Sequence, residues 1–406
     1  MSDSVMVIGG GIAGIQAALD LAHGGVRVVL VERAPTIGGA MAVLDKNFPT
    51  LDCSICIEAP KMSEVGLHPN IEVLSLAEVE SVEGNPGDFS VTLRQKARYV
   101  TSACTRCGEC SSVCPVLLPN EYDSGMAARK AIYTPIPQSV PGPYLIDMTR
   151  CLNDPPNYIP CDHCQQACPP KAIDYLMPQE TTLKRHVGAI IVATGYEMLD
   201  PRELREYGYG THPDILTALE FERLVNSAGP TGGEILRPSD GQHPHKLLFV
   251  LCVGSRDARH AQHCSRFCCM YSIKHAYQAL DHGVDDVTVL YMDVRAYGKG
   301  FDGFWQRTAS QGAKFVHGRP ARIADNRDGR IQVIYEDIDL GERFDSQYDM
   351  VVLANAVLPP QGLGDLAVRL GIETDPDGFL HSNEIAGGLI MTNRPGIYTA
   401  GCVSGP

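Results

Sequence analysis

Long apolar runs and an excess of positive charge are both missing from this 406-residue sequence. No apolar run approaches the roughly 20 residues of a membrane helix, so we expect no direct membrane span. Lys and Arg number 34 against 48 Asp and Glu, a formal charge of −14. That balance argues against nucleic acid or anionic lipid as the main partner, because phosphate binding requires clustered positive charge. The first four residues also lack the basic region of a signal peptide, which predicts a reducing, cytoplasmic location.

Cysteine, in contrast, is abundant. The chain has 15 cysteines, and in a reducing compartment that number indicates metal or redox chemistry rather than structural disulfides. Cysteines that serve as small core residues would scatter, whereas these fall into four blocks and one outlier. The length predicts two or three domains, at about 150 residues each.

A strand–turn–helix–strand pattern begins the chain. An apolar strand at 5–8 leads into a GxGxxG turn and a helical pattern, and a second apolar run ends at an acidic residue. Glycines allow the tight turn, the approach of a pyrophosphate and close helix packing, and the acid accepts hydrogen bonds from a ribose. The alternative is a glycine-rich turn without a ligand. The predicted nucleotide-binding residues here are Gly9, Gly11, Ile12, Ala13, Gly14, Glu32 and Arg33.

Three further segments favour FAD over NAD at this site, because they resemble flavoproteins that have two dinucleotide-binding domains. Gly38 and Gly39 follow the acidic residue, residues 189–196 read as a strand with an ATG turn, and residues 396–405 read as the late flavin-contacting strand. Cys402 stands where such flavoproteins usually have Asp, so backbone N–H groups would replace that carboxylate. The FAD-binding residues added by these segments are Gly38, Gly39, Ala193, Thr194, Gly195, Gly401 and Cys402.

A second Rossmann-like unit is predicted from the strand at 246–252. No GxGxxG turn follows this strand, so direct oxidation of NAD(P)H is not expected. A set of four thiols follows instead, and we interpret it as a 4Fe–4S cluster that replaces the nicotinamide site; buried apolar cysteines are the alternative. The four are Cys252, Cys264, Cys268 and Cys269.

Residues 99–178 read as an inserted ferredoxin-like module. The first run of cysteines has the x2-x2-x3 spacing followed by proline that is typical of bacterial ferredoxins, in which the last cysteine ligates the other cluster. A second run repeats this spacing, with its first cysteine set back by a loop. The crossed assignment predicts two 4Fe–4S clusters, with a one-cluster module or a zinc site as alternatives. One cluster takes Cys104, Cys107, Cys110 and Cys168; the other takes Cys114, Cys151, Cys161 and Cys164.

Cys53 and Cys56 form a CxxC pair after the flavin glycines. Three interpretations remain open: inert thiols, a flavin-coupled redox pair, or ligands to a cluster shared with a partner. Lys61 lies close by in the sequence and is a candidate cation beside the flavin. We treat these three residues as catalytic candidates.

These blocks predict an α/β fold of the two-dinucleotide-binding, thioredoxin reductase-like Rossmann type with an inserted iron–sulfur domain. The FAD-binding domain is expected in three parts, and the second Rossmann-like domain lies between the last two. The boundaries are 1–98 and 179–242 for the first two FAD-binding parts, 99–178 for the insert, 243–358 for the second domain and 359–406 for the last FAD-binding part.

With these motifs the chain resembles the A-type subunits of heterodisulfide reductase and their relatives. The segments CTRCGECSSVCP, CVGSRD and CSRFCCMYSIK carry the resemblance, together with LDKNFPTLDCSICIEAPKM and the closing AGCVSGP. The compact form with a cluster-bearing insert is most similar to the A-type component of the quinone-interacting membrane-bound oxidoreductase complex.

The resemblance implies an FAD- and iron–sulfur-containing electron-transfer subunit. It would pass electrons between a quinone-linked membrane module and adenylylsulfate reductase in dissimilatory sulfur metabolism. A homologous B-type subunit and a membrane-bound, haem-bearing C-type subunit would be its partners and hold it at the inner face of the cytoplasmic membrane. The alternatives are a component of a soluble, electron-bifurcating heterodisulfide reductase-like complex and a stand-alone disulfide reductase.

Overall fold

The computed structural model describes residues 3–153, 159–326, 329–385 and 389–406. Residues 154–158, in the loop that sets Cys151 back from the second run, lie outside the described residues. The chain forms two compact units, and the first comprises Met1–Ala42, Cys56–Gly195 and Pro359–Gly405. None of the helices in the described part is both long and apolar enough to cross a membrane.

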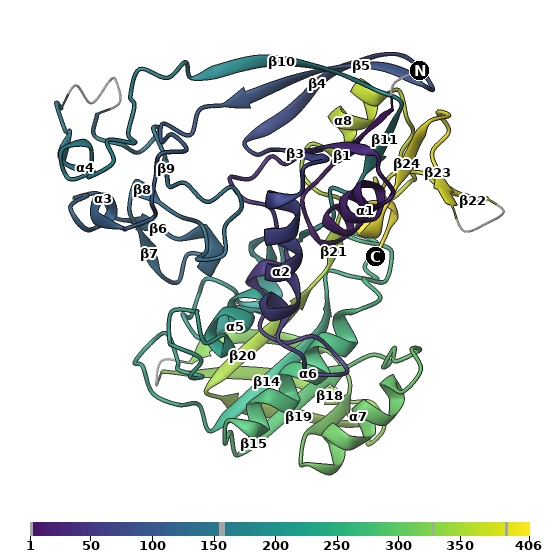
Figure 1. Ribbon diagram of the computed structural model, residues 1–406. Coiled ribbons are helices and arrows are strands. Elements are labelled where there is room, and N and C mark those ends of the chain that lie inside the picture. The colour runs from purple at the N-terminus through teal and green to yellow at the C-terminus, as the bar shows by residue number, and fades with distance from the viewer. Residues whose placement is uncertain (1–2, 154–158, 327–328, 386–388) are drawn as a thin grey trace. The chain divides into compact units, whose positions relative to one another are not determined.

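The first unit is built on a seven-stranded sheet in which the last five strands of the order given below are parallel. Strand β1 lies in the middle of these five parallel strands, and its run of apolar residues is typical of a parallel strand buried on both faces. Two further strands continue the sheet in antiparallel direction beside β24 (Figure 1). The order is β22 (Asn383–Ile385), β23 (Leu389–Met391), β24 (Ile397–Thr399), β11 (Ala189–Val192), β1 (Ser4–Ile8), β2 (Arg27–Val31) and β3 (Ile71–Leu74).

Helices and a smaller sheet complete the core of this unit. Helix α1 (Ile12–His23) buries Ile15, Ala18, Leu19 and Ala22, the i, i+3, i+4, i+7 stripe of an amphipathic helix. Helix α8 (Leu363–Leu370) and most of helix α2 (Ser54–Leu67) belong to the same unit. The smaller antiparallel sheet contains β4 (Ala77–Asn85), β5 (Asp88–Lys96) and β10 (Glu180–Val187).

The cysteine-rich segment lies between β5 and β10 and belongs to the first unit. Its regular structure is sparse, and cysteines form much of its core. Its short strands and single-turn helices lie together (Figure 1). They are α3 (Glu109–Ser112), β6 (Leu118–Pro119), β7 (Ala128–Arg129), β8 (Ile132–Tyr133), β9 (Leu145–Ile146) and α4 (His163–Gln166).

The second unit comprises Val43–Ile55, Tyr196–Leu358 and Pro406. A five-stranded parallel sheet forms its centre, a three-stranded antiparallel sheet follows, and β12 (Glu197–Met198) pairs with β21 (Val357–Leu358). The helices are α5 (Ala218–Val225), α6 (Cys268–Asp281) and α7 (Phe301–Ser310). The strands of the two sheets are β13 (Ile215–Thr217), β20 (Met350–Asn355), β14 (Lys246–Val253), β15 (Asp286–Tyr291), β16 (Lys314–His317), β17 (Pro320–Asn326), β18 (Arg330–Asp337) and β19 (Glu342–Tyr348).

The division between the units differs from the predicted boundaries in two places. Residues 196–242 join the second unit because β13 pairs in parallel with β20 of its sheet. Residues 43–55 join it because the Asp45 N–H donates to the Glu222 carboxylate and Asn226 Nδ2 donates to the Leu44 carbonyl. Both connections are non-local, which is why sequence patterns did not indicate them.

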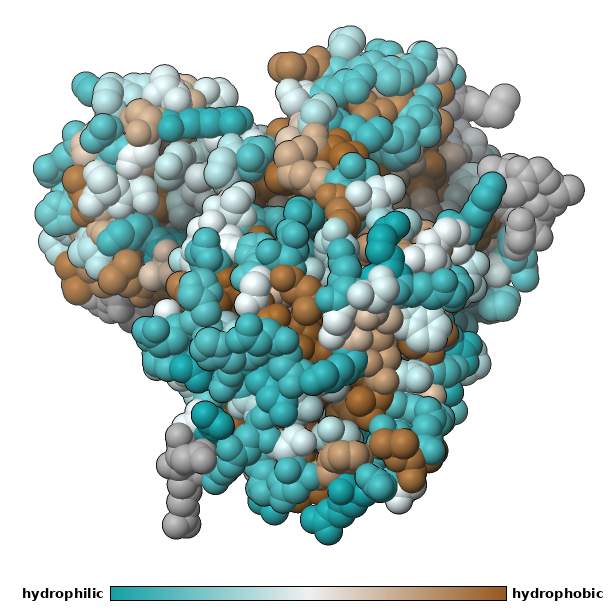
Figure 2. Space-filling view, turned by 90° about the horizontal axis from the view of Figure 1, so that it is seen from below, coloured by the Kyte–Doolittle hydropathy of each residue, from teal (hydrophilic) through white to brown (hydrophobic). Residues whose placement is uncertain are grey.

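Hydrophilic residues are spread over the face drawn in Figure 2, with apolar residues interspersed among them. Large hydrophobic side chains that are exposed include Leu67, Leu117 and Leu176. The last two belong to the cysteine-rich segment, whose small core leaves apolar side chains on its surface.

Candidate functional site

The turn between β1 and α1 has room only for glycine at two positions. Gly9 has a φ of 107°, and a Cβ atom there would lie 2.3 Å from the Ala193 carbonyl oxygen. A Cβ atom on Gly14 would lie 1.9 Å from the Gly9 carbonyl oxygen. The turn is therefore packed closely against the helix behind it and the neighbouring strand, as a dinucleotide-binding turn requires.

Glu32 directly follows β2, beside this turn. Its carboxylate accepts hydrogen bonds from the backbone N–H groups of Gly10 and Ala34, both at 2.6 Å. Burial nevertheless raises the pKa of Glu32 above its ordinary value. A carboxylate has further lone pairs for a ribose hydroxyl. Arg33 is directed elsewhere, because its Nη1 donates to the Gln361 carbonyl at 2.9 Å.

The other predicted flavin segments lie at the same turn. Gly38 donates its N–H to the Gly10 carbonyl at 2.7 Å, and a Cβ atom on Gly39 would lie 2.8 Å from the Gly11 Cα atom. Thr194 follows β11 and has a buried Oγ1 without a hydrogen-bond partner among the described residues. An unpaired buried hydroxyl beside a glycine-lined turn fits a polar cofactor such as FAD.

The last predicted flavin segment lies against the start of α1. Gly401 has a φ of 72°, and a Cβ atom there would lie 2.8 Å from the Cβ of Ala13. Cys402 follows in the same single turn of 3-10 helix and is half-buried. The structure thus brings this turn to the helix N-terminus, where Ile12 is the first helical residue.

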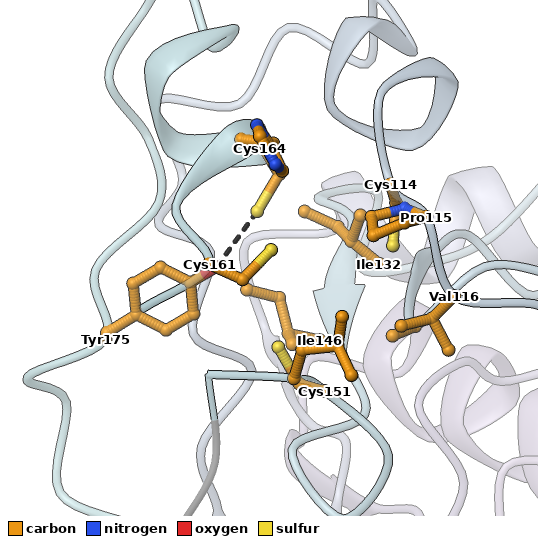
Figure 3. A pocket seen from close by; sticks show the side chains of 12 residues that line it. Cys114, Pro115, Val116, Ile132, Ile146, Cys151, Cys161, Cys164 and Tyr175 are labelled. Atoms are coloured by element: carbon orange, nitrogen blue, oxygen red, sulfur yellow. Dashed lines mark hydrogen bonds between the residues drawn. The ribbon is translucent and has the colours of Figure 1, made fainter. Parts of the chain in front are cut away.

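Four thiols of the cysteine-rich segment line one pocket (Figure 3). Cys161 and Cys164 come from the turn at α4, Cys114 follows α3, and Cys151 comes from a separate loop. Their sulfur atoms point toward the same space, and the other labelled side chains around it are mainly apolar. These are the four residues that the crossed ferredoxin assignment places together.

The surroundings of this pocket favour the protonated thiol over the ionised thiolate in cysteines that bind no metal. Burial raises the pKa of Cys151 and of Cys164, and the neighbouring thiols raise each further. Across the described residues, no three His, Cys, Asp or Glu side chains form a group suited to a single metal ion. Because the ligands of a four-iron cube stand further apart than those of one ion, the donor set still fits a cluster.

The other predicted set of the insert is less enclosed. Burial raises the pKa of Cys110 to about 12, with Cys104, Cys164 and Cys168 contributing. Cys168 accepts the Ala172 N–H at 3.3 Å, whereas Cys107 is exposed.

Three cysteines of the four-thiol set predicted for the second Rossmann-like domain lie in direct contact. Cys252 is the penultimate residue of β14 and has a φ of 58°, an uncommon value for a residue other than glycine. Cys268 begins α6, and its hydrogen bonds lower the pKa of Cys252 and lower that of Cys269 to about 7. Cys264 lies outside this chain of hydrogen bonds and accepts the Arg266 N–H at 3.4 Å.

The CxxC pair is oxidised: Cys53 and Cys56 form a disulfide at the first turn of α2. Lys61 lies further along the helix, and its Nζ donates to the Gln16 Oε1 of α1 at 2.7 Å. That contact ties α2 to α1.

Glu58 is a residue whose burial the sequence did not indicate. It lies on the face of α2 shared with Met62 and Val65, and all three are 0% exposed. Both of its carboxylate oxygens are buried without a hydrogen-bond partner among the described residues. Burial raises the pKa of Glu58 to about 8. Met62 packs near Gly38, a predicted flavin-binding glycine, and Glu58 lies about one helical turn from Met62.

A buried ionic group of the second unit was also not predicted. Lys274 forms an ion pair with Glu222, and His275 Nε2 lies 2.7 Å from the same carboxylate. Burial alone would raise the pKa of Glu222, but Lys274 and His275 outweigh it and lower the pKa to about 2. Lys274 Nζ also donates to the Lys46 carbonyl at 2.9 Å, so this group anchors the segment that leads to Cys53.

Comparisons with known proteins agree with this description. The model of the FAD dependent oxidoreductase family matches residues 4–44. The thioredoxin reductase of Lactococcus lactis has a similar structure, with a TM-score of 0.52 and 16% identity over 99% of this chain and 90% of that one. The thioredoxin reductase of T. acidophilum has a TM-score of 0.52 and 13% identity, covering 99% of this chain and 90% of that one. The predicted thioredoxin reductase-like α/β fold is thereby confirmed.

Curated relatives are much more similar in sequence. The A-type iron–sulfur subunit of the CoB–CoM heterodisulfide reductase of Methanocaldococcus jannaschii is 47% identical over 409 residues, which is 99% of this chain and 61% of that protein. The A-type subunit of the ferredoxin:CoB-CoM heterodisulfide reductase of Methanosarcina mazei is 41% identical over 409 residues, 100% of this chain and 51% of that protein. The chain therefore spans between half and two thirds of the length of these relatives.

Proposed function

Because the chain belongs to the family of A-type heterodisulfide reductase subunits, we propose that it is an FAD- and iron–sulfur-dependent electron-transfer component of an oxidoreductase complex. The convergence of Cys114, Cys151, Cys161 and Cys164 on one pocket carries this proposal. FAD would exchange electrons in ones or in pairs, and the clusters would exchange single electrons.

The chain's own residues would perform three tasks. The turn at Gly9–Gly14 would bind the pyrophosphate at the N-terminus of α1, with Glu32 at the ribose. Thr194 would offer its unpaired hydroxyl to the flavin chain. The three cysteine sets would hold clusters, the set with Cys114 in a mainly apolar pocket, and the set at Cys252 would occupy the place of a nicotinamide site.

The comparisons favour a heterodisulfide reductase-like complex over the quinone-linked complex. The relatives described above are named for the reduction of CoB–CoM heterodisulfide, which makes that complex the better-supported proposal. Electron transfer between a quinone-linked membrane module and adenylylsulfate reductase, with B-type and C-type partner subunits at the inner membrane face, remains a prediction from the sequence resemblance.

Cofactor analysis of the anaerobically purified chain tests the proposal. We expect one FAD and about twelve iron atoms per chain, since three clusters contain four iron atoms each. Cys114→Ser should lose about four of these iron atoms. Cys402→Ser is the matched control, because Cys402 belongs to none of the three sets, and its iron content should stay unchanged. Four or fewer iron atoms in the unaltered chain would contradict the multi-cluster proposal.

A further inference from the structure

A phenol hydroxyl contacts one of the four thiols in the pocket of Figure 3. Tyr175 Oη lies 2.9 Å from Cys164 Sγ, and the dashed line in the figure marks this hydrogen bond. Tyr175 lines the pocket from the segment that follows the second cysteine run, and its side chain is half-buried. Neither the cysteine spacing nor the family resemblance assigns a role to this tyrosine.

The direction of the hydrogen bond follows from the chemistry of an iron ligand. Between a thiol and a phenol either group can donate. A cysteine that binds iron is a thiolate and has no proton, so Tyr175 must then donate its O–H to Cys164. The phenol retains this proton near neutral pH, because an ordinary tyrosine has a pKa of about 10.

The surroundings make this donor effective. Ile132, Ile146 and Val116 line the same pocket, so few polar groups compete for the sulfur. A hydrogen bond to a charged acceptor is stronger than a neutral one and is strengthened by a low local dielectric. An electron added to a cluster increases the negative charge on its sulfur ligands, and a donor to those sulfurs therefore stabilises the reduced state.

We propose that Tyr175 raises the reduction potential of the cluster held by Cys114, Cys151, Cys161 and Cys164, through the hydrogen bond that its hydroxyl donates to Cys164. This inference rests on the proposed function, since it requires a cluster in that pocket. Tyr175 acts through a ligand and is a tuning residue. The other cluster of the insert differs, because the contact to Cys168 comes from the backbone N–H of Ala172 and is not removed by changing a side chain.

Tyr175→Phe removes the hydroxyl and keeps the ring. Tyr144→Phe is the matched control, because Tyr144 lies beside the other set, near Cys104, Cys107 and Cys110, without a hydrogen bond to a thiol among the described residues. The complete chain is purified anaerobically, its iron is counted, and the cluster midpoints are measured by redox titration followed by EPR. We expect unchanged iron in both variants and a shift of one cluster midpoint to lower potential in Tyr175→Phe alone.

Two results overturn the inference and leave the proposed function intact. The first is a full iron content with unchanged midpoints in Tyr175→Phe. The second is a loss of about four iron atoms in that variant, which would make Tyr175 a structural support of the site. Resonance Raman spectra give an independent readout, since loss of the hydrogen bond should raise an iron–cysteine stretching frequency. Four or fewer iron atoms in the unaltered chain would instead contradict the multi-cluster proposal on which this inference rests.

Discussion

The buried carboxyl group of Glu58 gives a prediction about stability that follows from the structure. Its pKa is about 8 in the folded chain, against an ordinary value of 4.5. Between these values the unfolded chain releases the proton and the folded chain retains it, so stability falls as the pH rises. The loss of folding stability caused by Glu58 is absent well below pH 4.5. It reaches about 3 kcal/mol at pH 7, because each pH unit above the ordinary pKa contributes about 1.36 kcal/mol.

Replacing Glu58 with Gln removes this pH dependence, because an amide does not titrate. We therefore expect the stability of Glu58→Gln relative to the unaltered chain to increase by about 3 kcal/mol between roughly pH 5.5 and pH 8. Anaerobic urea titrations followed by far-ultraviolet circular dichroism measure the difference at each pH. The control is Glu64→Gln on the same helix, where the carboxylate is half-exposed and pairs with His23.

Infrared spectroscopy tests the same reasoning without unfolding. A protonated carboxylic acid has a carbonyl stretch that an ionised one lacks, so this band should be present at neutral pH and absent in Glu58→Gln. Two results together would refute the conclusion that Glu58 is neutral in the folded chain. The first is that the stability of the unaltered chain and that of Glu58→Gln depend on pH in the same way. The second is that the unaltered chain lacks the carbonyl band of a protonated acid at neutral pH.

Three further predictions concern the nucleotide turn, the disulfide and the buried ion pair. Gly14→Ala places a Cβ atom 1.9 Å from the Gly9 oxygen, and strain of about 2 kcal/mol should weaken FAD binding about thirtyfold, as measured by flavin retention. Gly303→Ala, where a Cβ atom meets nothing within 4 Å, should retain its flavin. Cys53→Ser should change the rate of flavin reduction if the disulfide is coupled to the flavin, and an unchanged stopped-flow rate would argue for an inert pair. Lys274→Met should cost about 3 kcal/mol in urea titrations because it leaves Glu222 buried without its main partner, and a further Glu222→Gln change should restore part of that loss.

The parts of the site that could be predicted from the sequence are those fixed by local spacing. The glycines at 9, 11 and 14 form one turn, and a short turn allows few backbone arrangements. The crossed cysteine grouping was also predictable, because ferredoxin spacing encodes which thiol leaves its own run. The structure brings Cys114 to the three other thiols of its set, although a long loop separates it from Cys151.

The features that could not be predicted depend on contacts between distant residues. The hydrogen bond between Cys164 and Tyr175 requires the chain to turn back over eleven positions, and no motif marks that return. The ion pair between Glu222 and Lys274 joins residues that are 52 positions apart. Glu58 is an intermediate case, since its i, i+4, i+7 spacing with Met62 and Val65 marks a buried face, but acidic residues are rarely fully buried.

The exchange of one cysteine between the two sets of the insert has a consequence for how the domain assembles. Cys114 belongs to the first run but faces the thiols of the second, and Cys168 belongs to the second run but lies with Cys110 of the first. In the proposed arrangement, each cluster fixes the position of the chain segment that also carries one ligand of the other cluster. Filling one site would lower the entropic cost of closing the other, so iron uptake should be cooperative and the half-loaded insert should be scarce.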